Sequence, residues 1–312
     1  MSHPRRFRFG ADMSGPLPGM TWPDTVRRLE DLGYSTVFLP DHFDEQFGPF
    51  TALAAAAIAS PTITLGTLVL DNDYRHPFVT AKEVATLDVI SEGRVELGVG
   101  AGWKKIDYEQ SGITMDRPKV RVDRMIEGIE VMRRAFADGP FDFAGEHYTV
   151  TGYDGLPKPH RPGGPPLLVG GGAPRMLRWA GANADIVGVN PSIHSGEIDM
   201  EAARDGLAER IDQKVAWVKE GAGDRFDDLE INAWVPVVEV TDDAAGYAEA
   251  AAPLFDTTPD ELLASPMTMI GSTGEIAERL QARRERWAYS YHVVQAPSVE
   301  ALAPVVAQLS GT

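Results

Sequence analysis

Short hydrophobic segments alternate along the chain with longer segments in which apolar residues recur at helical spacing. Several of the short segments are continuous runs of Val, Ile and Leu, which is typical of parallel strands covered on both faces. The eight strands predicted in this way are Phe7–Asp12, Thr36–Pro40, Ile63–Leu70, Val95–Val99, Pro166–Gly170, Ile186–Asn190, Ile231–Val240 and Tyr291–Gln295.

Helices are predicted between these strands. One begins after Thr21, a suitable N-cap, and ends at Gly33. His76 is interpreted as the cap of another helix rather than as a catalytic group, and Lys119–Ala137 has apolar residues at helical spacing. Alternation of strand and helix over the whole chain favours a (β/α)8 TIM barrel over a doubly wound sheet, with residues 1–312 as a single domain.

Two insertions interrupt the alternation, at about 141–165 and 244–266. Phe141–Val150 has strand-like aromatic residues around a glycine and is predicted to form a hairpin, followed by a Pro/Gly-rich loop. Ala244–Pro266 is acidic, rich in alanine and predicted to be helical. Insertions in a barrel often form lids over its C-terminal mouth.

Composition restricts the classes of partner. The net charge of −17 argues against nucleic acids and anionic membranes. No apolar run is long enough for a transmembrane helix, and no secretory signal is recognised. The chain has no cysteine, which excludes disulfides and thiolate metal sites and fits the cytoplasm. Asp71-Asn72-Asp73 is interpreted as a solvated turn, so no metal is expected.

Three predicted strands end in residues that suggest a binding site. Gly98, Gly100 and Gly102 alternate, so one side of the backbone lacks side chains and a flat ring or a phosphate could approach it. A tight turn would explain such a pattern equally well. Its combination with Asp41-His42 and with Gly170-Gly171-Gly172 suggests a barrel with a cofactor at one mouth.

With these motifs in place, the chain resembles the bacterial luciferase-like superfamily of flavin and deazaflavin barrels over nearly its whole length. Within that superfamily it looks most like the branch that uses coenzyme F420, a 5-deazaflavin. The resemblance rests on Asp41-His42-Phe43, Leu65–Val69, Arg75-His76-Pro77, Ala81–Gly102, Gly170–Gly172 and Ile270-Gly271-Ser272.

The resemblance implies where the cofactor binds. It implies a non-proline cis peptide at Leu68-Val69 in a bulge that supports the ring. The amides of Gly170–Gly172 would hold the cofactor phosphate at the start of a helix over Ala173–Ala184. The expected cofactor-binding residues are Thr67, Leu68, Val69, Asp71, Gly98, Gly100, Ala101, Gly102, Gly170, Gly171 and Gly172.

The resemblance also implies catalytic and substrate-binding roles. His42 and Asp41 are the expected catalytic residues, and Asp12 and Trp103 are expected at the substrate. Trp103 stands where related sugar-phosphate dehydrogenases carry a glutamate, and the loop over Asn190–Asp199 has no lysine or arginine. A hexose phosphate is therefore disfavoured, and a less charged substrate is expected.

Three functions remain open at this stage. The first is an F420-dependent oxidoreductase acting on a small organic molecule. The second is a monooxygenase that uses reduced FMN supplied by a separate reductase, and the third is a non-catalytic flavin-binding barrel. A homodimer is expected in each case, because Phe50–Ile58 is apolar and rich in small residues that let helices approach closely.

Overall fold

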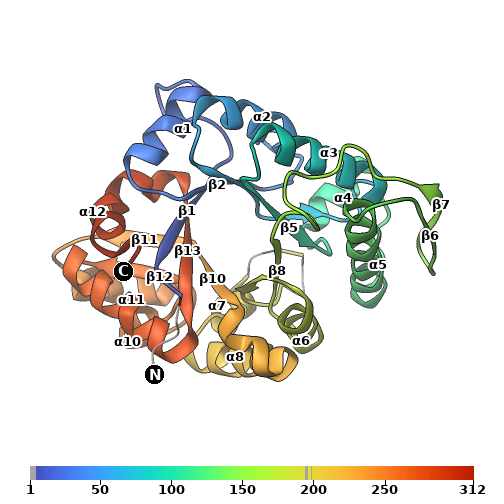
Figure 1. Ribbon diagram of the computed structural model, residues 1–312. Helices are drawn as coiled ribbons and strands as arrows, with labels where there is room; N and C mark the ends of the chain where they lie inside the picture. The colour runs from blue at the N-terminus through green and yellow to red at the C-terminus, as the bar shows by residue number, and fades with distance from the viewer. Residues whose placement is uncertain (1–4, 194–195, 198) are drawn as a thin grey trace. The chain divides into compact units, whose positions relative to one another are not determined.

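The structure is a computed structural model that describes residues 5–193, 196–197 and 199–312 (Figure 1). Its strands are β1 (Arg8–Asp12), β2 (Thr36–Leu39), β3 (Thr64–Thr67), β4 (Leu70–Asp71), β5 (Val95–Gly100), β6 (Phe141–Ala144), β7 (Thr149–Tyr153), β8 (Leu167–Gly171), β9 (Ile186–Val189), β10 (Glu230–Val235), β11 (Val237–Val240), β12 (Thr268–Gly271) and β13 (Tyr289–Gln295).

The α-helices are α1 (Trp22–Asp31), α2 (Pro49–Ala59), α3 (Pro77–Ile90), α4 (Lys105–Ser111), α5 (Pro118–Phe136), α6 (Pro174–Asn183), α7 (Met200–Asp205), α8 (Ala208–Ala222), α9 (Ala244–Ala251), α10 (Pro259–Ala264), α11 (Thr273–Trp287) and α12 (Val299–Leu309). Three 3-10 helices are η1 (Gly223–Asp228), η2 (Ala252–Phe255) and η3 (Ala296–Ser298) in the part of the chain that the structure describes.

The main sheet has the strand order β3-β2-β1-β13-β10-β9-β8-β5-β4, and β3 also pairs with β5. This additional pairing closes the parallel strands into a barrel with flanking helices. The predicted (β/α)8 TIM barrel is therefore confirmed, as is the hairpin in the first insertion, which is β6–β7.

Two of the predicted strands are divided in the structure. The strand predicted over Ile63–Leu70 is β3 and β4, and the cis peptide Leu68-Val69 lies between them. The prediction of a single strand over Ile231–Val240 is also wrong. Pro236, which has no N–H to donate, separates β10 from β11, and β11 pairs with β12 in a separate sheet.

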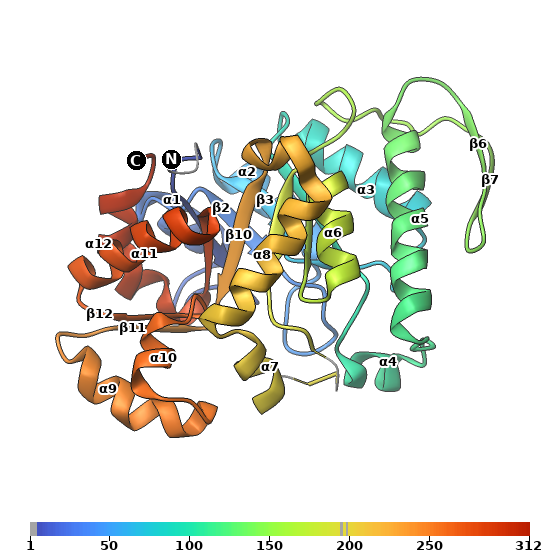
Figure 2. The same ribbon diagram turned by 90° about the horizontal axis from the view of Figure 1, so that it is seen from below.

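The chain divides into two compact units. The first unit comprises residues 1–13, 28–36 and 169–312, and the second comprises residues 14–27 and 37–168. In the first unit, β13 pairs with both β1 and β10, and helices α6 and α8 lie side by side (Figure 2). The second predicted insertion is helical, as expected, and forms α9, η2 and α10.

The helices of this second insertion share a small hydrophobic core with β11 and β12, which we call the insertion core. Phe255 and Leu263 pack against its edge. Its buried members are Ala244, Ala248, Ala251, Ala252, Leu262 and Ile270.

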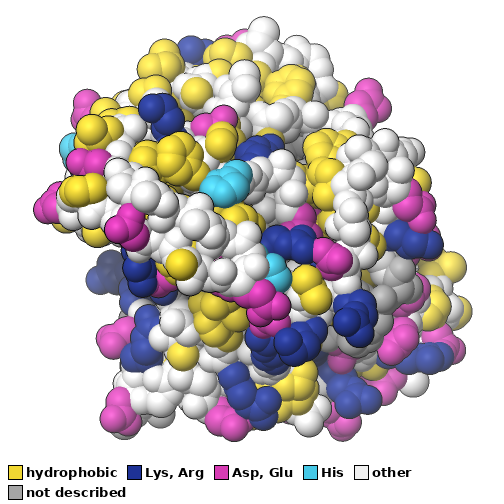
Figure 3. Space-filling view, turned by 90° about the vertical axis from the view of Figure 1, so that its right-hand side faces the viewer, with side chains coloured by type: hydrophobic (Ala, Val, Ile, Leu, Met, Phe, Trp, Pro, Cys, Tyr) yellow, Lys and Arg dark blue, Asp and Glu magenta, His cyan; other side chains and the backbone are white. Residues whose placement is uncertain are grey.

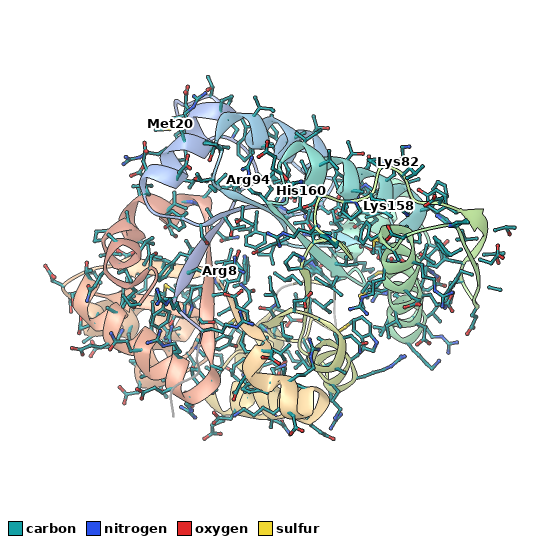
Figure 4. The ribbon with its side chains drawn as sticks, viewed as in Figure 1. Arg8, Met20, Lys82, Arg94, Lys158 and His160 are labelled. Carbon is teal, nitrogen blue, oxygen red and sulfur yellow. The ribbon has the colours of Figure 1, made fainter. Side chains whose placement is uncertain are left out.

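In the second unit, α3 packs between α2 and α5, and the β6–β7 hairpin lies beyond α5 (Figures 1 and 2). The loop after the hairpin is held by two lysines: Lys82 donates to the carbonyl of Leu156, and Lys158 donates to the carbonyl of Ala135 (Figure 4).

The surface charges are mixed. On the face in Figure 3, Lys and Arg side chains lie among Asp and Glu side chains despite the negative net charge. No helix within the described residues is long and apolar enough to cross a membrane.

Candidate active site

His42 follows the C-terminal end of β2 in the second unit. Its Nδ1 lies 2.7 Å from Oδ2 of Asp107, while its Nε2 has no hydrogen-bond partner among the described residues. The His42 side chain is 19% exposed, and the edge of the Trp103 ring packs against it with 5.4 Å between ring centroids. One nitrogen of the imidazole is therefore held by the protein, and the other is left for a ligand.

Asp107 is the site residue that the sequence interpretation missed. It lies in the first turn of α4 and is only 2% exposed. The Tyr74 hydroxyl donates to the same Oδ2 at 3.2 Å, and burial together with nearby carboxylates raises the pKa of Tyr74. Lys104 Nζ lies 4.0 Å from Oδ1 and forms a closer ion pair with Asp44, at 2.5 Å. Asp107 thus has a proton donor and a positive charge beside it.

Asp41 is engaged on both of its carboxylate oxygens. Arg75 donates to Oδ2 at 2.5 Å and to Oδ1 at 2.8 Å, and the backbone N–H of Asp71 donates to Oδ2. Asp41 is only 4% exposed. The bond from Asp71 joins the end of β2 to β4, and the ion pair with Arg75 occupies both oxygens. Asp41 is therefore less suited than His42 to the proton transfer suggested by the sequence.

Asp71 is also fully engaged. Its Oδ2 accepts from the hydroxyl of Tyr108 at 2.9 Å, and its Oδ1 accepts from the backbone N–H of Asp73. Burial raises the pKa of Asp71 to about 6, against the effect of those two hydrogen bonds. The carboxylate stabilises the turn after β4.

The protein's own atoms account for the alternating glycines. A Cβ on Gly98 would lie 2.0 Å from the carbonyl oxygen of Thr67, whose hydroxyl bonds the backbone of Gly98. Gly102 has φ +77°, and a Cβ there would lie 1.8 Å from the Tyr108 hydroxyl. The side without Cβ atoms, which the sequence suggested was open to a ring, is therefore filled by neighbouring protein. Accessible surface remains on half-buried neighbours, namely Leu68, Val69 and Ala101.

In the first unit, Gly170–Gly172 form the end of β8 and the approach to α6. Lys214 donates to the Gly172 carbonyl at 2.8 Å and pairs with Asp205 at 2.6 Å, so a buried ammonium fixes the loop. The N-cap of α6 is Ala173, whose side chain cannot cap the helix. No side chain caps the N-terminus of α6, and a helix N-terminus favours an anion such as a phosphate.

Asp12 ends β1 in the first unit. Trp234 Nε1 donates to its Oδ2 at 2.9 Å, whereas the buried Oδ1 has no partner among the described residues. Burial raises the pKa of Asp12 to about 6, and the bond from Trp234 opposes this shift. Asp12 can therefore hold a proton closer to neutrality than an ordinary carboxyl group.

The class that these elements define is a parallel (β/α)8 barrel with a histidine at a strand end in one unit and a glycine-rich loop at a strand end in the other. The family model of the luciferase-like monooxygenases matches residues 8–238. The chain belongs to the luciferase-like monooxygenase family.

Two curated relatives are named for coenzyme F420 or for a pterin substrate. A 5,10-methylenetetrahydromethanopterin reductase of Archaeoglobus fulgidus is 30% identical over 58% of this chain and 52% of that protein, so the alignment spans about half of its length. An F420-dependent glucose-6-phosphate dehydrogenase of Intrasporangium calvum is 26% identical over 88% of each chain.

Solved structures support the same fold. The coenzyme F420 dependent tetrahydromethanopterin reductase from Methanopyrus kandleri has a TM-score of 0.75 at 20% identity, covering 98% of this chain and 99% of that one. A type II Baeyer-Villiger monooxygenase of Pseudomonas putida in complex with FMN has a TM-score of 0.71 at 17% identity, covering 98% of each. The chain is an enzyme of the oxidoreductase class, and both kinds of cofactor occur among similar proteins.

Proposed function

We propose that the chain is an F420-dependent oxidoreductase that transfers a hydride between the deazaflavin and a small, uncharged organic molecule. The observation that carries this proposal is the open Nε2 of His42 at the end of a barrel strand, where barrel enzymes place catalytic residues. The names of the relatives support coenzyme F420 as the cofactor.

The cofactor would supply a carbon that accepts or donates hydride. The protein would orient the substrate and move one proton, with His42 Nε2 as the proton-transfer atom, because imidazole titrates near neutral pH. The first-turn amides of α6 would hold the phosphate of the cofactor. Asp12 in the first unit is retained as a substrate-binding residue.

The surroundings of His42 favour an uncharged substrate. Phe43 and Ile106 are 49% and 44% exposed, and Trp103 packs against the imidazole. The nearby cation of Lys104 is already paired with Asp44. A phosphate ester would find no unpaired cation in this part of the described second unit, whereas an apolar ketone, imine or secondary alcohol would contact the exposed apolar side chains.

The test is a pair of binding titrations with coenzyme F420 and FMN, followed by a screen of ketones, imines and secondary alcohols. We expect tighter binding of F420 and substrate-dependent absorbance changes of the deazaflavin without oxygen uptake. Binding of reduced FMN with substrate-dependent oxygen uptake would instead establish the monooxygenase alternative, which the FMN-bound structural neighbour favours. Binding of neither cofactor would overturn both.

The proposal includes a homodimer and a cytoplasmic location. The dimer is supported by exposed apolar residues on α2 and α3, of which Ile58 is 79% exposed. The location is supported by the absence of cysteine.

A further inference from the structure

We propose that Asp107 is a positioning residue that holds His42 in the tautomer protonated at Nδ1, which makes Nε2 the reacting nitrogen. This inference rests on the proposed function for its catalytic consequence. It begins from one contact between residues distant in the sequence, the 2.7 Å pair of His42 Nδ1 and Asp107 Oδ2.

The neighbours of Asp107 suit it as a hydrogen-bond acceptor. The Tyr74 hydroxyl donates to Oδ2, and because burial raises the pKa of Tyr74, this phenol keeps its proton. The ammonium of Lys104 lies 4.0 Å from Oδ1. An ionised carboxylate can only accept hydrogen bonds.

The tautomer of His42 follows from this. If Asp107 only accepts, Nδ1 of His42 must donate, and a neutral imidazole has one N–H. Its Nε2 therefore carries a lone pair. The edge of Trp103 packs against the ring at an interplanar angle of 85°, which limits rotation of the imidazole. Both contacts keep Nδ1 at Asp107 and leave Nε2 for a ligand.

This arrangement suits the interconversion of an alcohol and a carbonyl compound. In the oxidative direction, a bound deazaflavin would supply the hydride acceptor when the C–H bond of the alcohol breaks. The O–H bond breaks, its proton passes to Nε2, and the C=O bond forms. The Asp107 carboxylate stabilises the resulting imidazolium, and every transfer reverses when a carbonyl compound is reduced.

The first experiment compares Asp107→Asn with Asp44→Asn, which removes a nearby carboxylate that pairs with Lys104 and has no bond to His42. We expect Asp107→Asn to lower kcat by about 100-fold with little change in KM. Asp44→Asn should change kcat by less than about threefold, since exposed ion pairs contribute little. Equal kcat values for Asp107→Asn and the wild type would overturn the inference.

The same substitution is then made in a His42→Ala background. A residue that acts through His42 should cause no further loss there, whereas a residue with a structural role would lower kcat by the same factor in both backgrounds. Thermal melting of each variant controls for folding.

The second experiment needs neither cofactor nor turnover. The nitrogen resonances of the seven histidines are recorded in 15N-labelled protein, and the His42 signals are identified by their loss in His42→Ala. We expect an Nδ1–H tautomer in the wild type and loss of that preference in Asp107→Asn. An Nε2–H tautomer in the wild type would overturn the inference. Absence of turnover with coenzyme F420 would overturn the proposed function and leave the tautomer to be decided by this spectrum.

Discussion

At the scale of single residues, two histidines show that the surroundings decide whether this side chain serves chemistry or packing. His42 is partly exposed and keeps one nitrogen open. His292 in β13 is 1% exposed, lies between the rings of Phe7 and Phe9, and has no partner for either nitrogen among the described residues. Burial, with a smaller effect of Arg283, lowers the pKa of His292 to about 3. It is a neutral core residue.

His42→Ala should lower turnover by about 10²–10⁴-fold if the imidazole transfers the substrate proton. Cofactor affinity should change much less, because the proposed phosphate site lies on other residues. Steady-state kinetics on a substrate found by the screen, together with cofactor titrations, would measure both. Turnover equal to that of the wild type would make His42 structural and would leave Asp12 as the better proton donor.

His292 predicts a loss of stability in acid. An unfolded histidine takes up a proton near pH 6.5, whereas folded His292 does so only near pH 3. Between these values the unfolded state binds more protons, so the free energy of unfolding falls as pH decreases, by up to about 1.4 kcal/mol per pH unit. The effect is absent above about pH 7.

Denaturant unfolding of wild type and His292→Phe at about pH 4 to 7 would measure this. The variant should lose part of the acid sensitivity, and substitution of the exposed His160 by Gln should not (Figure 4). Parallel pH dependence in wild type and His292→Phe would contradict the assignment.

At the scale of elements, the loop between β8 and α6 carries the expected phosphate site, and the three glycines differ in what surrounds them. A Cβ on Gly171 would lie 2.6 Å from Met176, and one on Gly172 would lie 2.4 Å from the backbone of Ser192. A Cβ on Gly170 would have no neighbour closer than 3.2 Å. Gly170 is therefore the position at which a side chain can probe the anion site with least damage to the fold.

Gly170→Asp should weaken binding of coenzyme F420 by about tenfold or more, because a carboxylate would oppose the phosphate. Gly170→Asn has nearly the same shape without the charge and serves as the control. Fluorescence titrations would compare both variants with the wild type. If Gly170→Asp and Gly170→Asn bind coenzyme F420 with equal affinity, this loop does not hold the phosphate.

Elements were easier to predict from the sequence than contacts. The alternation of strands and helices and the glycine-rich strand ends specified the barrel. The prediction of one strand over Ile231–Val240 was wrong because it gave the hydrophobic run more weight than Pro236. Asp107 was missed because an acidic residue in a helix's first turn is common, and its partner His42 lies 65 residues away. The alternating glycines are explained by neighbouring protein atoms, which no local pattern reveals.

At the scale of the whole molecule, the exposed apolar residues bear on assembly. Helix α2 is apolar on nearly all sides, which is unusual for a helix at a free surface. Ile58, Val89 and Ile90 are exposed by 79%, 45% and 46%. A second copy of the chain would remove such side chains from water.

Ile58→Glu should therefore shift the protein from dimer to monomer, because a buried interface would have to accept an unpaired carboxylate. Light scattering at micromolar concentration would measure the mass. Leu254→Glu is a matched control, since Leu254 is 74% exposed and lies in the second insertion. A monomeric wild type would refute the expected dimer. A dimeric Ile58→Glu variant would show that the dimer interface does not include Ile58.

The insertion core joins the segment over 244–266 to the small β11-β12 sheet, which is separate from the main sheet. Because the hydrophobic residues of this segment pack on β11 and β12, changes in its sequence should affect these two strands more than the remaining fold. Related barrels can then differ in this segment and in the small sheet beneath it while the strands of the main sheet stay the same.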